Sequence, residues 1–278
     1  MNKLGKIEVD YLNICWQYCE QNEVEIVPYI LADYSVLKIT FYNAYKTVDE
    51  KNSSFWNKEL RKVKKRIRKY DLNQCAIHMD KDMERIMGKE GTAYYSRKQE
   101  FLYHRYEISK MLREGRNPGR NRVLIILDNN MLNFHELEMV LLTIKDTFED
   151  ITVFTTEKSD IINRVCEFLQ DEWGVYITKV EMIRDLENVY DATVALVACW
   201  KEEYIKLCYG RVYLLSKEEE PLSDFSLENR SEVSIFSGMD YVCHGKPVPN
   251  QMAVDLIYQK KENNKKTVPS SVAICELK

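Results

Sequence analysis

Three apolar runs in the second half of the sequence are each followed by short polar, charged or aromatic side chains. If the runs are parallel strands, their carboxyl ends meet at one edge of a sheet, which is where open α/β sheets bind ligands. The residues that follow are therefore candidate ligand-binding residues for a small polar molecule, with turn formation as their alternative role. They are Asp128, Asn129 and Asn130 after the first run, Thr156, Glu157 and Lys158 after the second, and Cys199, Trp200 and Lys201 after the third.

The turn after the first run lacks the glycines of a dinucleotide-binding loop. A G-x-G-x-x-G motif at this place lets backbone N–H groups approach a pyrophosphate. Residues 128–133 read Asp-Asn-Asn-Met-Leu-Asn instead, and no glycine occurs between Gly119 and Gly174. A diphosphate would also meet Asp128, and two like charges about 4 Å apart repel by roughly 4 kcal/mol at intermediate dielectric. The sequence therefore predicts no NAD(P) cofactor, and it contains no recognisable catalytic motif.

Cys243 and His244 are adjacent, a combination that a thiolate nucleophile and its base would require. Neighbouring side chains of an extended segment point to opposite faces, however, and the following Gly245 and Pro247 indicate a turn. A structural role is therefore favoured over a nucleophile or a ligand.

Four further residues have the types and local spacing of zinc ligands. They are Cys15, Cys19, Cys75 and His78. On helices, each pair would lie one turn apart, and four such ligands suit tetrahedral zinc. The alternative is that the cysteines are free, buried thiols, which are common in a reducing compartment. We therefore predict no metal, and whether the four side chains come together stays open.

Residues 61–70 contain seven cations, interrupted by Val63, Ile67 and Tyr70. On a helix the three apolar side chains share the inner face and the cations occupy the outer arc. Such an arc is typical of a solvated helix surface, and it is also able to bind a phosphate backbone. The candidate polyanion-binding residues are Lys62, Lys65, Arg66 and Lys69.

Basic and acidic residues are segregated along the chain, although the net charge is only −4. Residues 56–122 hold 19 basic and 9 acidic side chains, a net charge of +10, whereas residues 123–242 hold 10 and 24, a net charge of −14. The change falls at Gly115–Arg122, a linker-like stretch with two glycines and a proline. Opposite charges favour pairing of the two surfaces, within the chain or with a protein partner, over nucleic-acid binding. The predicted parts are a basic domain 1–118, an acidic domain 119–260 and a polar tail 261–278.

Strands and helices alternate regularly after residue 122. Val123–Leu127 is a continuous apolar run, as expected of a strand buried on both faces, and Phe134–Phe148 has a helical apolar stripe. This alternation predicts right-handed βαβ units on a doubly wound, mainly parallel sheet of the Rossmann-like α/β class. Further strands are expected at Ile151–Thr155, Val175–Thr178, Ala192–Ala198 and Arg211–Leu215, and further helices at Ser159–Trp173 and Val180–Leu186.

The first part of the chain has weaker periodicity. Ile7–Glu20 reads as a helix and Val24–Val27 as a strand, whereas Val36–Tyr42 fits either. Residues 57–114 show apolar and aromatic side chains at helical spacing. The expected N-terminal domain is therefore mostly helical and of the α+β class.

Composition narrows the class of protein. The chain is 45% apolar and 30% charged, values typical of a globular protein. No apolar run reaches the length of a membrane span, and the first residues carry charges where a signal peptide has its apolar core. The 8 cysteines lack paired spacing, which is typical of free thiols in a reducing compartment. We expect a cytoplasmic protein without a membrane partner.

The order of the two parts resembles two-domain enzymes of the shikimate dehydrogenase and glutamyl-tRNA reductase kind, which also place a substrate domain before a Rossmann domain. The resemblance covers layout alone, because the glycine motif is missing, and it assigns no catalytic residue. A complete βαβ scaffold without recognisable catalytic groups predicts a binding or regulatory protein, a degenerate relative of such enzymes that acts through protein contacts, self-association or a small ligand. The alternatives are an enzyme that uses Asp128, Glu157 and Lys201 on a small polar metabolite, and a nucleic-acid-binding protein.

Overall fold

The structure is a computed structural model that divides the chain into two compact units. One unit comprises Met1–Arg97 and Met239–Ala273, and the other comprises Lys98–Gly238 and Ile274–Lys278. Most of the predicted linker Gly115–Arg122 lies outside the described residues, so a boundary there stays a prediction. The described residues are 6–20, 23–43, 53–73, 75–87, 92–114, 121–127, 132–156, 160–186, 190–197, 201–216, 233–259 and 269–277.

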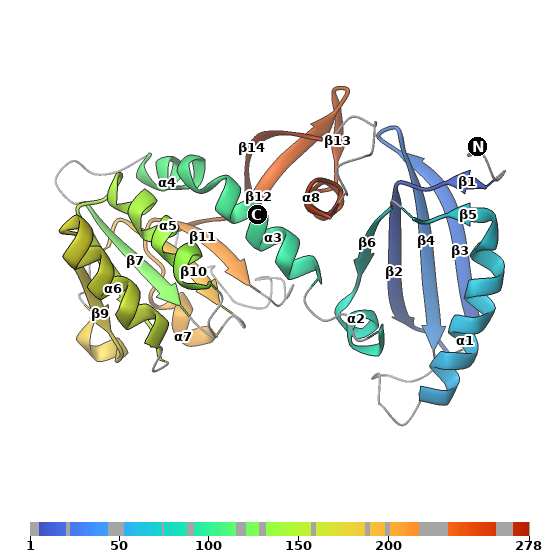
Figure 1. The fold of residues 1–278 in the computed structure, drawn as a ribbon, viewed down its shortest axis with the longest axis horizontal. Helices are drawn as coiled ribbons and strands as arrows, with labels where there is room; N and C mark the ends of the chain where they lie inside the picture. The colour runs from blue at the N-terminus through green and yellow to red at the C-terminus, as the bar shows by residue number, and fades with distance from the viewer. Residues whose placement is uncertain are drawn as a thin grey trace. The chain divides into compact units, whose positions relative to one another are not determined.

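Six parallel strands of an eight-stranded sheet lie in the second unit, the last of them up to Gly238 (Figure 1). Their order is β12-β11-β10-β7-β8-β9, and every neighbouring pair is parallel. Counted along the chain from β7, this is the order 6-5-4-1-2-3 of the Rossmann fold, which confirms the predicted fold class. The strands are β7 Arg122–Leu127, β8 Asp150–Phe154, β9 Ile177–Val180, β10 Ala192–Val197, β11 Arg211–Ser216 and β12 Ser234–Cys243.

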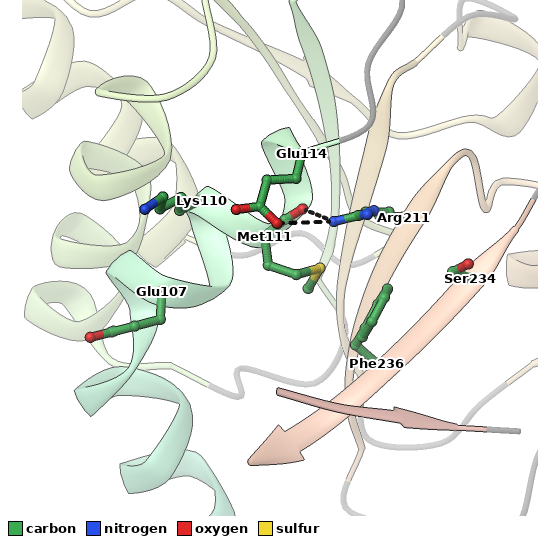
Figure 2. Close-up of a pocket in the computed structure, with 7 residues that line it drawn as sticks. All are labelled: Glu107, Lys110, Met111, Glu114, Arg211, Ser234 and Phe236. Atoms are coloured by element: carbon green, nitrogen blue, oxygen red, sulfur yellow. Dashed lines mark hydrogen bonds and ion pairs between the residues drawn. The ribbon is translucent and has the colours of Figure 1, made fainter. Parts of the chain in front are cut away.

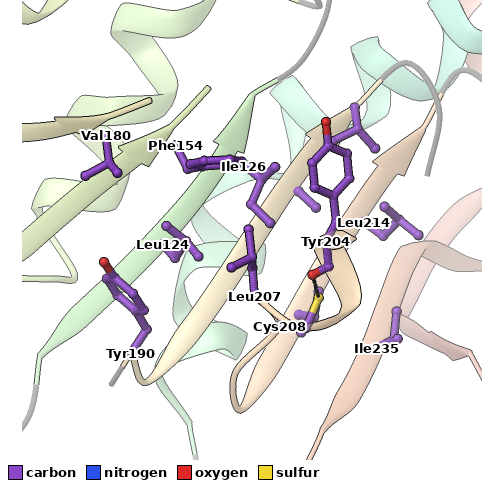
Figure 3. Close-up of a cluster of buried hydrophobic side chains, with 13 residues drawn as sticks. Leu124, Ile126, Phe154, Val180, Tyr190, Tyr204, Leu207, Cys208, Leu214 and Ile235 are labelled. Carbon is purple, nitrogen blue, oxygen red and sulfur yellow. Dashed lines mark hydrogen bonds between the residues drawn. The ribbon is translucent and has the colours of Figure 1, made fainter. Parts of the chain in front are cut away.

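Helices cover both faces of this sheet. Leu124 and Ile126 of β7 belong to a buried cluster that also contains Tyr204 of helix α7 (Figure 3). The opposite face is covered by α4, α5 and α6, and Val140 of α5 lies there beside Val194 of β10. Burying one such aliphatic side chain contributes about 1.5–3 kcal/mol, so the apolar runs determine which segments enter the core. The helices are α4 Arg105–Arg113, α5 Phe134–Lys145, α6 Asp160–Trp173 and α7 Glu202–Ile205.

The first unit contains a four-stranded mixed sheet in the order β3-β4-β2-β6. Strands β4 and β6 run parallel to the central β2, and β3 is antiparallel to β4. Leu37 and Ile39 of β4 pack in a core with Val63 of helix α1 and Met83 of helix α2. The elements are β2 Tyr11–Tyr18, β3 Glu23–Leu31, β4 Tyr34–Asn43, α1 Ser53–Arg66, β6 Ala76–Met79 and α2 Lys81–Met87.

The C-terminal part of the chain contributes helix α8, Asn250–Tyr258, and the short strand β13, Lys246–Val248, to the first unit. The two-residue strands β1, Ile7–Glu8, and β5, Tyr70–Asp71, pair with each other in parallel. Helix α3, Thr92–Tyr103, strand β12 and strand β14, Ser270–Leu277, each contain a point where the chain changes unit. No described helix has both the length and the apolar character needed to cross a membrane.

Two sequence predictions in the first unit need correction. Ile7–Glu20 is not a helix, because Tyr11–Tyr18 of this range is a strand hydrogen-bonded to neighbours on both sides. A central strand buries side chains on both faces, which blurs the alternation that marks a strand in sequence. Residues 57–114, read as helical, also include strands β5 and β6. The range Val36–Tyr42, which fitted either state, lies within strand β4.

Candidate functional site

The predicted ligand-binding residues follow β7, β8 and β10, which are neighbours in the sheet. Because these strands are parallel, their carboxyl ends do meet at one edge, as the sequence predicted. Thr156 is exposed two residues after the end of β8, and Lys201 is the residue before α7, with its ammonium 5.2 Å from the Tyr204 ring centroid. The others lie outside the described residues: Asp128, Asn129, Asn130, Glu157, Lys158, Cys199 and Trp200.

The helix that follows β7 begins with a capping box. Oδ1 of Asn133 accepts a hydrogen bond from the backbone N–H of Glu136 at 3.0 Å. In return, Oε2 of Glu136 accepts the backbone N–H of Asn133 at 2.9 Å. Two N–H groups at this end of α5 are therefore satisfied by the protein itself. The Asn133-x-x-Glu136 spacing is a sequence signature of such a cap, and sequence reasoning missed it.

Glu136 also holds the side chain of Lys98. The Lys98 ammonium lies 2.9 Å from Oε1 and 3.0 Å from Oε2 of Glu136, and the two side chains are 15% and 12% exposed. In a dinucleotide-binding Rossmann domain, the positive end of the helix after the first strand faces the pyrophosphate. Here that helix end is occupied by a carboxylate, and the nearby lysine already has a carboxylate partner. The arrangement disfavours a diphosphate at this position.

A buried carboxylate is the main polar feature of the first unit. Asp255, on α8, is fully buried, and its Oδ2 accepts the hydroxyl of Tyr11 at 3.0 Å. Its Oδ1 accepts the side-chain amides of Gln251 at 3.1 Å and Gln259 at 2.7 Å. Nδ1 of His78 lies 3.4 Å from Oδ2. These groups supply the donors that a buried carboxylate needs.

The same network reaches the backbone of the sheet. Oε1 of Gln259 accepts the N–H of Ile77, in strand β6, at 3.0 Å, and its Nε2 lies 3.3 Å from Oγ of Ser96. The network thus attaches α8 to β2, β6 and α3 by hydrogen bonds, which suits a structural anchor. Sequence analysis missed Asp255, although a single acidic residue within the apolar stretch 252–257 marks a buried charge.

The four residues considered as zinc ligands contact different partners. Sγ of Cys15 lies 3.5 Å from the Thr40 hydroxyl, and Sγ of Cys75 lies 3.2 Å from the Leu72 carbonyl oxygen. Burial raises the pKa of the Cys75 thiol to about 11, which disfavours the thiolate that a metal requires. Cys15 and His78 lie on strands, so the helical spacing assumed for the four residues is wrong. Among the residues that the structure describes, no three His, Cys, Asp or Glu side chains form a metal-ligand group.

The basic residues predicted on a helix lie on α1 and on the 3₁₀ turn Ile67–Lys69 that follows it. Val63 is buried, and the cations Lys62, Lys65, Arg66 and Lys69 are exposed. Three of these cations have local contacts: Lys62 pairs with Glu59 at 2.5 Å, Arg66 donates to the Val24 carbonyl oxygen at 2.8 Å, and the Lys69 ammonium lies 5.2 Å from the Tyr70 ring centroid. The exposed cationic arc is available for a polyanion or an acidic surface.

Cys243 and His244 lie at a tight turn between β12 and β13. Cys243 is buried, and a hydrogen bond with it adds to the effect of burial in raising the pKa of Tyr34. His244 is exposed, and its Nδ1 lies 3.2 Å from Oδ2 of Asp33, whose Oδ1 accepts the Lys246 ammonium at 2.8 Å. The two side chains therefore have separate partners, and the geometry gives no thiolate–imidazole pair.

No protein-family model and no curated protein matches this chain. Among solved structures, L-tryptophan dehydrogenase from Nostoc punctiforme is similar with a TM-score of 0.39 and 8% identity, over 89% of this chain and 71% of that protein. The Δ1-pyrroline-2-carboxylate reductase of Thermococcus litoralis, solved with NADH and L-proline, is similar with a TM-score of 0.29 and 10% identity. That match covers 45% of this chain and only 37% of the reductase. Similarities at this level assign neither a family nor an activity to this chain.

Proposed function

We propose that this chain is a cytoplasmic Rossmann-like binding or regulatory protein that does not use a dinucleotide, a degenerate relative of two-domain NAD(P) enzymes. Its ligand is a small polar molecule bound at the carboxyl ends of β7, β8 and β10. Protein contacts or self-association through its oppositely charged surfaces accompany this binding.

The observation that carries the proposal is the closed N-terminus of α5. Glu136 bonds the N–H of Asn133 and the ammonium of Lys98, so a diphosphate here would have to displace an internal cap and an ion pair. The glycine-free sequence 128–133 adds side chains where backbone would have to approach phosphate. Both features oppose a dinucleotide at the N-terminus of α5, a position that a smaller ligand at the strand ends does not need.

Thermal unfolding with added ligands tests the proposal. We expect no shift in the melting temperature with millimolar NAD(H) or NADP(H), since binding at 100 times Kd adds about 2.7 kcal/mol and is readily detected. A clear shift with either cofactor would contradict the proposal.

A screen of small polar metabolites by the same method tests the site itself. We expect at least one hit that is weakened by Asp128→Ala and by Glu157→Ala. The matched control is Asp150→Ala, which removes an exposed carboxylate at the opposite end of β8 and leaves the hit unchanged. A hit that none of these substitutions affects would place the ligand elsewhere. Substrate turnover that depends on Asp128, Glu157 and Lys201 would favour the enzyme alternative.

Nucleic-acid binding is the second candidate, and the exposed cations of α1 favour it. Fluorescence anisotropy with short DNA and RNA should then show binding whose log–log salt slope is near −0.9 per phosphate contacted. The quadruple alanine variant of Lys62, Lys65, Arg66 and Lys69 should lose this binding. A control variant replaces four lysines of the second unit: Lys110, Lys145, Lys179 and Lys206. Absence of binding at low salt would leave the cations to a protein partner or to the acidic surface of the chain.

A further inference from the structure

A hollow of about 580 Å³ opens at the amino edge of the second unit's sheet, the opposite end of the strands from the site proposed above (Figure 2). Its walls are one face of helix α4 and the first residues of β11 and β12. Arg211 begins β11 and pairs in register with Ser234, which begins β12. The α4 side chains that line the hollow are spaced three and four residues apart, so they share a face. They are Glu107, Lys110, Met111 and Glu114.

Arg211 is held in place by three contacts. Its Nη1 donates to the carbonyl oxygen of Met111 at 2.8 Å and lies 3.6 Å from Oε2 of Glu114. The guanidinium carbon lies 5.9 Å from the ring centroid of Phe236. A cation at the carboxyl end of a helix is stabilised by the free carbonyl groups and by the helix dipole. These contacts orient the guanidinium before any ligand arrives.

The donors that remain on Arg211 determine what the hollow can bind. All its hydrogen bonds to described residues use Nη1, so Nε and Nη2 have no partner among them. These two N–H groups are parallel and match the two oxygens of a carboxylate. The hydroxyl of Ser234, on the neighbouring strand, likewise has no partner among the described residues and offers a third donor.

Glu114 is the competing anion. The side chains of Glu114 and Arg211 are 60% and 34% exposed, and an exposed ion pair of this kind is weak in water. Figure 2 shows Met111 and Phe236 facing each other beneath this pair, whereas Glu107 and Lys110 point away from Arg211. The anionic group of a ligand in the hollow would therefore contact Arg211, and a small apolar body would contact Met111 and Phe236.

We propose that this hollow binds the carboxylate of a small organic acid. The Nε and Nη2 groups of Arg211 and the hydroxyl of Ser234 donate to the carboxylate oxygens, and Met111 and Phe236 contact the apolar body. Glu114 acts as an internal competitor that the ligand displaces from the guanidinium.

Titration of the full chain with sodium benzoate, followed by NMR chemical-shift changes, tests this site. We expect Arg211→Met to weaken benzoate at least tenfold, because charge-assisted hydrogen bonds are lost. Arg211→Lys, which keeps the charge but lacks the two parallel N–H groups of the guanidinium, should also weaken benzoate binding. Glu114→Gln should bind about threefold more tightly, since the competing anion is removed. The matched control is Arg122→Met, which removes the arginine that begins β7 and pairs with Asp150 at 3.1 Å; it should change nothing.

Three outcomes would overturn the site. The first is that the wild type does not bind benzoate at any concentration used for the variants. The others are that the neutral isostere benzamide binds equally well, or that binding is insensitive to both Arg211 substitutions. Binding of inorganic phosphate in place of benzoate would overturn the carboxylate class. Asp128→Ala and Glu157→Ala should leave benzoate binding intact, so failure here and failure of the function proposed above are distinguishable.

Discussion

The two units hold their sheets together in different ways. In the second unit the central strands β7 and β10 are buried at every residue after Arg122, and Leu124 and Ile125 are 0% exposed. The helices that cover them follow or precede the strands closely in sequence. In the first unit, α8 is anchored through the buried carboxylate of Asp255, which bonds Tyr11 across 244 positions of the chain.

The two units should therefore respond differently to substitution. Apolar packing is non-directional, and a core accepts side chains of similar volume at little cost. A buried carboxylate needs specific donors, and each donor left without it remains buried and unsatisfied. We therefore expect the stability of the first unit to depend on the chemical type of the side chain at position 255. The stability of the second unit should depend on side-chain volume at many core positions.

The largest expected effect is that of Asp255→Ala. Tyr11, Gln251 and Gln259 would lose their acceptor inside the protein, which should lower the free energy of unfolding by about 3–5 kcal/mol. Urea unfolding measures the loss, and hydrogen exchange at the Ile77 amide, which Gln259 binds, locates it. The control Asp240→Ala removes an exposed carboxylate of the same unit and should have little effect. Equal effects of the two substitutions would erase the contrast between the units.

Substitution of Leu124 tests the dependence of the second unit on side-chain volume. Leu124→Ala should cost about 2–5 kcal/mol, because a cavity remains in the cluster shown in Figure 3. Leu124→Met keeps the volume and should cost less than about 1.5 kcal/mol. Both values come from urea unfolding followed by far-UV circular dichroism. If Leu124→Met were as costly as Leu124→Ala, the second unit would also depend on specific geometry.

Two glycines of the second unit both have a positive φ, but only one of them has a close neighbour. Gly210 and Gly174 have φ values of +54° and +62°, a conformation that costs other residues about 1–3 kcal/mol. A Cβ at Gly210 would lie 2.2 Å from the carbonyl oxygen of Asp191, whereas a Cβ at Gly174 would meet nothing within 4 Å. Gly210→Ala should therefore destabilise more than Gly174→Ala in thermal unfolding. If the two substitutions lowered the melting temperature equally, the backbone at Asp191 would be able to move away from the new Cβ at no cost in stability.

The smallest expected effect lies at the exposed Asp33. Hydrogen bonds from Lys246 and His244 hold the pKa of this carboxyl below its usual value. A lowered pKa in the folded state gives stability that is present above the unfolded pKa, about 3.9, and is lost as the pH falls through the folded pKa. The melting temperatures of wild type and Asp33→Asn should therefore differ slightly at pH 6 and converge below about pH 3.9. A difference that grows on acidification would reverse the sign of this linkage.

Sequence reasoning succeeded where structure depends on neighbouring residues. The strand predicted at Val123–Leu127 is Arg122–Leu127, and the helix predicted at Ser159–Trp173 is Asp160–Trp173. Continuous apolar runs and helical stripes are local properties, and burial of those runs is what forms the core. It failed at Ile7–Glu20, because the pairing of this strand with β4 and β6 is a property of distant segments.

The candidate sites divide in the same way. Residue order alone placed Thr156 and Lys201 after strands, and it showed that residues 128–133 contain no glycine. Only the tertiary structure made β7, β8 and β10 neighbours and brought Lys98 to Glu136, 38 positions away. The same holds for Arg211 beside the end of α4, 100 positions from Met111. Local patterns determine which segments are buried, whereas the partners of polar groups depend on how those segments pack, and no local pattern specifies that packing.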